Sequence, residues 1–316
     1  MSINPIRKIL TEPAQIYQAI SRRSLKNCPY QNCATCPNDL LCTKECKNEA
    51  FCLSCLSDIF NNSNSKNRAY TCENITFSYV LRFLNRYASE VFHILNNNIK
   101  FINREETNVL SIGCGPATEL IGFEKYIHTN KDIKINFWGY DMNPVWTSCH
   151  KFFPDIFRYR NNVNVFFQTQ FLNENNPIVK EINFLFLNYL ISDIYKHAKT
   201  NPSKEVMDYL TKVITPIFLK MPSESYVIIN DTNSCYMGRN EIETWINSVN
   251  SSALSVKKGV FDYPGRYNYA NFNAGGKVES NNTLIFPAPN SAFVNYDKYT
   301  INVNECRSAY VVLQRR

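Results

Sequence analysis

The sequence contains no long apolar stretch, and it has no apolar segment near its first residue. No uninterrupted apolar run approaches the roughly 18 residues that a membrane span requires. The first residues, MSINPIRKILTEPAQ, lack the apolar core of a secretory signal peptide. We therefore expect a cytoplasmic protein with no membrane partner.

Charged residues are also sparse, at 19% of the 316 residues, with 34 Lys and Arg against 27 Asp and Glu. The formal net charge of +7 permits a nucleic-acid partner without establishing one. Hydrophobic residues make up 44% and aromatic residues 14%, too much for a disordered polymer. The length favours about two structural units.

Cysteines divide the chain, because eight of the 12 lie between positions 28 and 72. Two CxxC pairs, Cys33 with Cys36 and Cys52 with Cys55, can each bring two sulfurs to one ion. Without an export signal, this pattern favours metal thiolates over disulfides. Two four-cysteine zinc sites are the first interpretation, an iron–sulfur cluster is the alternative, and partly free or disulfide-bonded cysteines are a third. The predicted ligands are Cys28, Cys33, Cys36, Cys42, Cys46, Cys52, Cys55 and Cys72.

The pattern predicts an N-terminal helix within 1–27, the cysteine-rich module over 28–72, a connecting helix over 73–103 and a larger domain over 104–316. In the larger domain, short apolar runs alternate with helical stretches, as in a parallel sheet with crossover helices. We expect strands at 108–112, 133–140, 163–167, 182–187, 226–229 and 309–313, and helices at 117–128, 144–152, 203–220 and 239–249.

The first of these strands ends in a turn that contains Gly113, Gly115 and Pro116. Glycines allow the backbone amides to approach a ligand, and proline suits the first turn of a helix. Asp141 ends the second strand, where its carboxylate can accept the hydroxyl protons of a ribose. The order strand, glycine turn, helix, strand and terminal acid predicts a nucleotide site.

These residues resemble the class I S-adenosylmethionine-dependent methyltransferases. Their glycine motif matches at Gly113, Gly115 and, with alanine as the third residue, Ala117, and their ribose-binding acid matches Asp141. The resemblance covers about 104–316. It implies a doubly wound, Rossmann-like α/β methyltransferase sheet with S-adenosylmethionine as cofactor, here preceded by a small cysteine-rich metal-binding domain. A nicotinamide-binding fingerprint fits less well, because Thr118 stands where it requires a third glycine.

Two positions depart from the family pattern. Ser111 stands where the family usually carries an acid that helps to organise the methionine amine. After the third strand, where an acid commonly meets the adenine amino group, Gln170 could accept the same hydrogen bond through its amide oxygen. These departures leave room for a noncatalytic protein that keeps the fold.

The acceptor pocket is expected beyond the fourth strand, at the carboxyl edge of the sheet. Asn188 and Tyr189 are predicted to orient the acceptor, and Asp193 or His197 to take a proton. In the competing interpretation, Asn188 caps a helix, Tyr189 packs against the cofactor and Asp193 faces solvent. Because no Pro-Cys and no Asn-Pro-Pro-Tyr element follows this strand, methyl transfer to a cytosine ring or to an exocyclic DNA amine is not favoured.

The first functional hypothesis is an RNA methyltransferase whose cysteine module, with Arg22, Arg23 and Lys26, holds the nucleic acid. The alternatives are a methyltransferase for a small molecule or protein with a purely structural metal module, and a noncatalytic assembly protein. Protein partners cannot be named from the sequence. A polar segment at 263–282 would supply stacking and phosphate contacts through Tyr263, Arg266, Tyr267, Tyr269 and Phe272.

Overall fold

The computed structural model describes residues 73–100, 104–130, 133–151, 153–157, 162–173, 181–232, 234–249, 254–261, 277–279, 283–286 and 305–316. The predicted N-terminal helix and all eight predicted metal ligands, from Cys28 to Cys72, lie outside the described residues. So does most of the 263–282 segment. The described part of the chain comprises the sheet domain and the helix that leads into it.

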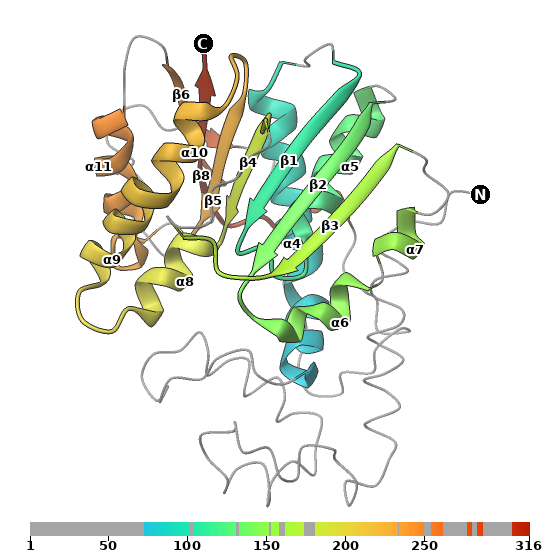
Figure 1. Ribbon diagram of the computed structural model, residues 1–316, viewed down its shortest axis with the longest axis horizontal. Coiled ribbons are helices and arrows are strands. Elements are labelled where there is room, and N and C mark those ends of the chain that lie inside the picture. The colour runs from blue at the N-terminus through green and yellow to red at the C-terminus, as the bar shows by residue number, and fades with distance from the viewer. Residues whose placement is uncertain are drawn as a thin grey trace, which may run out of the picture.

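Among the described residues, the centre is an eight-stranded sheet in the order β3-β2-β1-β4-β5-β8-β6-β7 (Figure 1). The first five strands along the chain pair in parallel. β8 is antiparallel to both of its neighbours, and β7 extends the edge in parallel with β6. The strands are β1 (Glu106–Ile112), β2 (Lys134–Asp141), β3 (Val163–Thr169), β4 (Phe184–Asn188), β5 (Tyr226–Asp231), β6 (Leu254–Phe261), β7 (Lys277–Glu279) and β8 (Ala309–Arg315).

The structure confirms the predicted alternation of strands and helices. Strands β6 and β7 were not predicted, and β7 lies within the 263–282 segment expected to be a loop. The single helix expected over 203–220 is divided by a π-helical turn. The helical elements are α4 (Glu73–Asn98), α5 (Thr118–Asn130), η2 (Pro144–Trp146), α6 (Thr147–His150), α7 (Phe153–Phe157), α8 (Leu190–His197), α9 (Pro202–Tyr209), η3 (Leu210–Ile214), α10 (Thr215–Lys220), η4 (Cys235–Met237) and α11 (Arg239–Val249).

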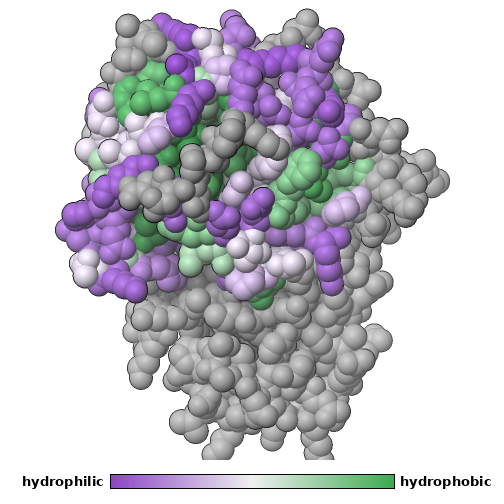
Figure 2. All heavy atoms as spheres, in the orientation of Figure 1, coloured by the Kyte–Doolittle hydropathy of each residue, from purple (hydrophilic) through white to green (hydrophobic). Residues whose placement is uncertain are grey.

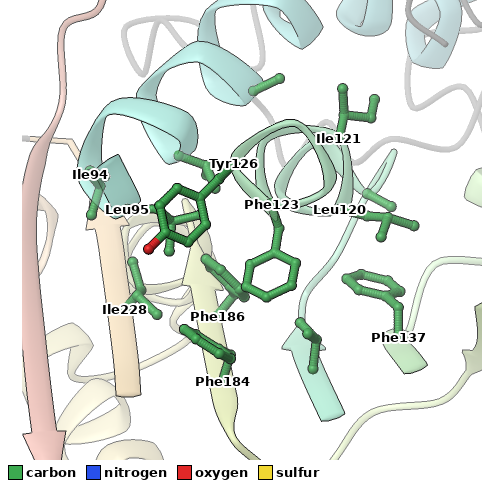
Figure 3. Close-up of a cluster of buried hydrophobic side chains, with 14 of the residues drawn as sticks. Ile94, Leu95, Leu120, Ile121, Phe123, Tyr126, Phe137, Phe184, Phe186 and Ile228 are labelled. Carbon is green, nitrogen blue, oxygen red and sulfur yellow. The ribbon is translucent and has the colours of Figure 1, made fainter. Parts of the chain in front are cut away.

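Helices cover both faces of the sheet, and strand β4 shows why. Its side chains alternate, so that Phe184 and Phe186 pack beneath α4 and α5, whereas Leu185 and Leu187 pack beneath α8 to α11. All four side chains are buried. Figure 3 shows the first of these two cores, with Phe123 of α5 above Phe184 and Phe186. Burial of each such side chain contributes about 1.5–3 kcal/mol, which makes this continuously apolar strand the centre of the domain.

The long helix α4, predicted as a connecting segment, is a structural layer of the sheet domain. Leu84, Val91 and Leu95 point into the core beneath it. It also packs closely on α5, because a Cβ atom added at Gly122 would lie 2.5 Å from the carbonyl oxygen of Ala88. The segment just before the first strand is therefore held firmly against the domain.

In the view of Figure 2, the described surface is largely hydrophilic, with separate hydrophobic patches. Among the large apolar side chains that are exposed, Met142 and Tyr236 follow β2 and β5, respectively, at the carboxyl edge of the sheet. Of the helices in the described part of the chain, none combines the length and the apolar character needed to cross a bilayer.

Candidate functional site

The strand order reverses between β1 and β4, because β2 and β3 lie on one side of β1 and β4 lies on the other. In open α/β sheets, ligands bind outside the carboxyl ends of the strands at such a point. This chain has a cleft there. We call one side of it the turn half, lined by Tyr79, Gly113, Gly115, Asp141 and Trp146, and the other side the α8 half, lined by Asn188, Tyr189, Ser192, Asp193, Lys196 and Met237.

The glycine turn after β1 is tight and strained. Gly113, Gly115 and Ala117 have φ angles of 66°, 48° and 55°, in the left-handed region that favours glycine. At Gly113 a side chain is excluded as well, since an added Cβ would lie 2.6 Å from Cδ1 of Leu190. His150, which the sequence did not suggest, supports the turn because its Nε2 lies 2.7 Å from the carbonyl oxygen of Gly115. Burial lowers the pKa of His150 to about 4, so the ring is neutral.

Asp141 lies directly against this turn. Its carboxylate accepts one hydrogen bond from the Gly115 amide and one from the Asn143 amide, each 2.8 Å long. Burial raises the pKa of Asp141 from 3.8 to about 6, although these two amides oppose the shift. Each carboxylate oxygen still has a lone pair available for a hydroxyl group in the cleft.

The other two predicted cofactor residues lie away from the cleft lining. Ala117 is fully buried beneath the turn. Gln170 follows β3, and its backbone amide donates to the carbonyl oxygen of Asp141 at 2.9 Å. The structure thus brings Gly113, Gly115 and Asp141 together, while Ala117 and Gln170 shape the backbone around them. Their roles toward a cofactor stay predictions.

A buried carboxylate that was not predicted from the sequence lies under the turn. Glu119, the second residue of α5, is 1% exposed and accepts a 2.5 Å hydrogen bond from the Ser111 hydroxyl. Thr118 donates to its other oxygen at 3.2 Å. Burial raises the pKa of Glu119 to about 7, and the bond from Ser111 opposes that shift. An acid in the first helical turn was the available sequence signal, but an acid there usually only complements the helix dipole.

A chain of side-chain amides crosses the strand ends in the α8 half. Asn188 donates to Thr118 Oγ1 at 2.9 Å and accepts from Asn230 at 2.7 Å. Asn230 also donates to Glu90 of α4 at 3.2 Å. The Asn188 amide, predicted to orient an acceptor, is thus itself oriented by α5 on one side and by β5 on the other.

Glu90 is fully buried and gathers donors from four parts of the chain. Besides Asn230, it contacts Arg86 Nε at 3.2 Å, the Tyr189 hydroxyl at 2.9 Å and the Arg307 amide at 2.9 Å. Neither Arg86 nor Glu90 was predicted from the sequence. Their spacing of four on one helix, which lets an arginine and a glutamate pair, was the signal that could have drawn attention to them.

Tyr189 is locked by these contacts. Its φ of 57° is rare for a bulky residue, and its ring stacks on Tyr87 with centroids 3.9 Å apart. The hydroxyl donates to Glu90 and accepts from Arg86 at 3.1 Å. Burial raises the pKa of Tyr189 well above its ordinary value. Tyr189 therefore serves as a rigid wall of the cleft, in line with the interpretation in which it packs against the cofactor.

Asp193 and Lys196 of α8 bring opposite charges to the cleft. Asp193 is half-exposed, and one of its carboxylate oxygens lies 3.3 Å from His197 Nδ1. Its hydrogen bond raises the pKa of His197. Burial lowers the pKa of Lys196, although Asp193 opposes that shift. Asp193 is thus the predicted proton acceptor that the structure places in the cleft, whereas His197 lies behind it.

Asp231, at the end of β5, has a different role. It is buried and accepts hydrogen bonds from the backbone amides of Ser192, at 3.0 Å, and Thr232. It thereby holds the first turn of α8 in place and leaves Thr232 to line the cleft. Asn233, which follows Thr232, lies outside the described residues.

The predicted metal site cannot be located in the structure, since its cysteines precede residue 73. The described residues contain no cluster of histidine, cysteine and acidic side chains that could hold a metal ion. Three cysteines of the sheet domain, Cys114, Cys149 and Cys306, are buried. They belong to the apolar interior.

No protein-family profile and no curated protein matches this chain. Solved structures do. The plantazolicin methyltransferase BpumL in complex with SAH is 12% identical, with 96% of this chain and 99% of that chain covered and a TM-score of 0.40. The plantazolicin methyltransferase BamL is 15% identical, with 84% and 96% covered and a TM-score of 0.42. The human methyltransferase 10 domain containing protein is 9% identical, with 73% and 82% covered and a TM-score of 0.40. Because these identities and TM-scores are low, the functional assignment rests on the residues of this chain.

Proposed function

We propose that this protein is an S-adenosylmethionine-dependent methyltransferase that acts on RNA. The observation that carries the proposal is the meeting of the glycine turn and Asp141 in one cleft at the point where strand order reverses. Such a cleft suits an adenosyl group, because a carboxylate at the end of the second strand can accept both ribose hydroxyl protons.

The residues of the turn half fit this cofactor. Gly113 and Gly115 expose backbone to the cleft, and the position of Leu190 leaves no room for a side chain at Gly113. The rings of Tyr79 and Trp146, with centroids 5.4 Å apart, form an aromatic wall beside them. When bound, S-adenosylmethionine supplies a methyl group on a sulfonium, which an acceptor atom can displace. Aromatic and carboxylate groups favour such a cation.

The α8 half supplies what methyl transfer asks of the protein, which is alignment of the acceptor and removal of its proton. Asn188 and Tyr189 present rigid surfaces, because hydrogen bonds hold both side chains. Asp193 is a carboxylate at the cleft, positioned to take a proton. Its contact with His197, whose Nδ1 lies 3.3 Å from a carboxylate oxygen and 2.9 Å from the Asp193 carbonyl oxygen, holds the carboxylate in place.

The choice of RNA as the acceptor draws on charge and exposed rings. The chain carries a net charge of +7, and Lys196 places a cation at the cleft. Tyr236 is 80% exposed, one residue before the cleft residue Met237. Exposed rings and cations are the groups that contact unstacked bases and their phosphates. The cysteine-rich module, with Arg22, Arg23 and Lys26, would extend this surface.

The cofactor assignment is tested by calorimetric titration of the purified protein with S-adenosylhomocysteine. We expect saturable binding, which Asp141→Ala weakens about a hundredfold because two hydrogen bonds to a charged group are lost. The matched control is Asp208→Asn, at a half-exposed carboxylate of α9 paired with Lys204 and remote from the cleft. Absence of binding by the unaltered protein, or unchanged affinity of Asp141→Ala, would overturn the assignment.

The acceptor class is tested with methyl-labelled S-adenosylmethionine in cell extract, followed by separation into RNA, DNA, protein and metabolites. We expect label in RNA, with retention on RNA that weakens steeply as salt rises. Label in protein or metabolites would instead select the alternative methyltransferase. Cofactor binding without any transfer would favour a noncatalytic assembly protein that retains the fold.

We also propose that the cysteines at 28–72 hold zinc, with an iron–sulfur cluster as the alternative. The support is the spacing of Cys33 and Cys36 and of Cys52 and Cys55. Elemental analysis of the purified chain should find zinc, and replacement of Cys33 and Cys36 together by serine should lower the zinc content. Cys235→Ser, outside the cluster, is the control. A brown chromophore with iron would select the cluster, and unchanged metal in the double variant would contradict the ligand assignment.

A further inference from the structure

We propose that Glu119 is a positioning residue for the cofactor site, acting as a strap that joins the two ends of the glycine turn. This inference rests on the proposed function. Glu119 does not line the cleft, and it acts through the backbone and side chains that do.

The strap spans the whole turn. Ser111 lies two residues before Gly113, and Glu119 is the second residue of α5. The 2.5 Å hydrogen bond between their side chains therefore ties the end of β1 to the start of α5. Both side chains are buried, at 0% and 1% exposure. A bond to a carboxylate that is shielded from water is among the stronger ones that a protein makes.

The turn needs such a restraint because Ala117 has a strained backbone conformation and the two glycines are free to adopt other conformations. Gly113, Gly115 and Ala117 alternate with residues of ordinary φ, and each holds a positive φ. For the non-glycine residue Ala117, such a conformation persists only where the surrounding structure holds it. The turn also places the Gly115 amide against the Asp141 carboxylate. A change in the shape of the turn would therefore move Gly115 and the carboxylate that is predicted to bind the ribose.

A second path leads from Glu119 to the α8 half through Thr118. The Thr118 hydroxyl has one proton, which it donates to Glu119 at 3.2 Å. Its lone pairs are then left to accept from Asn188 at 2.9 Å. Glu119 thereby fixes the direction of this hydroxyl and, through it, the orientation of an amide that lines the cleft.

The test uses the affinity for S-adenosylhomocysteine, measured by calorimetry, together with the melting temperature of each variant. Glu119→Ala is expected to bind about tenfold more weakly, as loss of a hydrogen bond to a charged group predicts. Glu119→Gln, which keeps the shape of the side chain and one acceptor, is expected to lose about threefold and serves if the alanine variant fails to fold.

Rescue distinguishes positioning from mere stability. Adding Ser111→Glu to Glu119→Ala places a carboxylate in the same space from the other end of the strap, and should bring the affinity back to within about threefold of the unaltered protein. The control is Glu243→Gln, on α11, where another buried carboxylate pairs with Lys258 at 3.4 Å. It should lower the melting temperature and leave the affinity unchanged.

The outcomes separate the two proposals. If the unaltered protein does not bind S-adenosylhomocysteine, the proposed function fails. If it binds and the folded Glu119 variants bind within about twofold of it, the strap is refuted while the function stands. A folded double variant without recovered affinity would also refute the strap.

Discussion

The two halves of the cleft are built from contacts of very different range. In the turn half, Asp141 bonds to the amides of Gly115 and Asn143, 26 and 2 residues away. In the α8 half, the Tyr189 hydroxyl bonds to Glu90, 99 residues away, and Glu90 bonds to the Arg307 amide, 217 residues away. The hydrogen bonds of Asp141 in the turn half thus join adjacent strands, with Tyr79 of α4 beside them, whereas the hydrogen bonds of the α8 half reach α4 and the chain just before β8.

This difference indicates which contacts hold each half of the cleft in shape. The turn half keeps its shape through the backbone conformation of its glycines together with the contacts of Glu119 with Ser111 and Thr118. The α8 half keeps its shape through one buried carboxylate that accepts three hydrogen bonds and pairs with Arg86, so the removal of Glu90 would leave several polar groups without a partner at once.

The largest expected effect is therefore on stability and comes from Glu90. Glu90→Ala should lower the free energy of unfolding by about 3–5 kcal/mol, because it leaves Arg86 buried beside an empty space. Urea denaturation measures this loss. Glu106→Ala, at an exposed carboxylate paired with Lys134, should cost no more than about 1 kcal/mol. A similar, small loss for both variants would contradict the central place given to Glu90.

A substitution of Asp193 tests whether the α8 half acts in methyl transfer and not in cofactor binding. Asp193→Asn should slow methyl transfer at least about a hundredfold, because the amide cannot take the acceptor's proton. Affinity for S-adenosylhomocysteine should stay within about threefold, since the turn half is untouched. Transfer at an unchanged rate would show that Asp193 only faces solvent. An equal loss of rate and affinity would show that it holds the cofactor instead.

Gly113 is where the two halves touch, and it offers a test of their packing. Gly113→Ala should cost roughly 2 kcal/mol of stability, because its φ is 66° and its new Cβ would lie 2.6 Å from Leu190. Gly115→Ala is the matched control. It has a similar φ of 48°, but its Cβ would meet Trp146 at an ordinary 3.8 Å, so it should cost about half as much. Equal losses in urea denaturation would argue against the close contact with Leu190.

The smallest expected effect is a pH dependence confined to the turn half. Because burial raises the pKa of Asp141 to about 6, protons compete with the ribose hydroxyls below that pH. Affinity for S-adenosylhomocysteine should fall about tenfold from about pH 7 to about pH 5. In Asp141→Asn the affinity should be weak at both values, and an equal fall in this variant would assign the titration to another group.

The contribution of Asp141 to the free energy of unfolding should change with pH in the opposite direction, and should decrease as the pH rises. The folded pKa of Asp141 is above its ordinary value of 3.8, so the folded state holds the proton more tightly. Its contribution to folding is fully present below about pH 4 and is lost as the pH rises to about 6. The difference in unfolding free energy between the unaltered protein and Asp141→Asn should therefore change over that range and be constant above it.

Much of the fold could be predicted from the sequence, because its signals are local. Periodicity predicted the apolar runs of β1 to β5 and β8 as strands, and the amphipathic stretch of α4 as a helix. Strand β6 escaped prediction, since its sequence LSVKKGVF carries two lysines and lies at the less regular side of the sheet. The cysteine-rich module stays a prediction, because its ligands lie outside the described residues.

The site divides in the same way. In the sequence, Ser111 stands where the family usually carries an acid. In the structure, the carboxylate of Glu119 lies against the Ser111 hydroxyl. From the sequence, Asn188 and Tyr189 could either orient an acceptor or serve as a helix cap and a packing residue. In the structure, α4 and β5 engage their polar groups. No spacing rule relates Glu90 to Tyr189 or Arg307, because their proximity depends on how α4 packs across the strand ends.

The sequence by itself determined the alternation of strands and helices, the glycine turn and the acid that follows β2, since each depends on backbone preferences or on residues in adjacent strands. Only the tertiary structure decided which side chains in the cleft are already bonded and which face it. That outcome depends on buried hydrogen bonds between segments far apart in the chain, whose partners are chosen by packing of the core and not by local propensity.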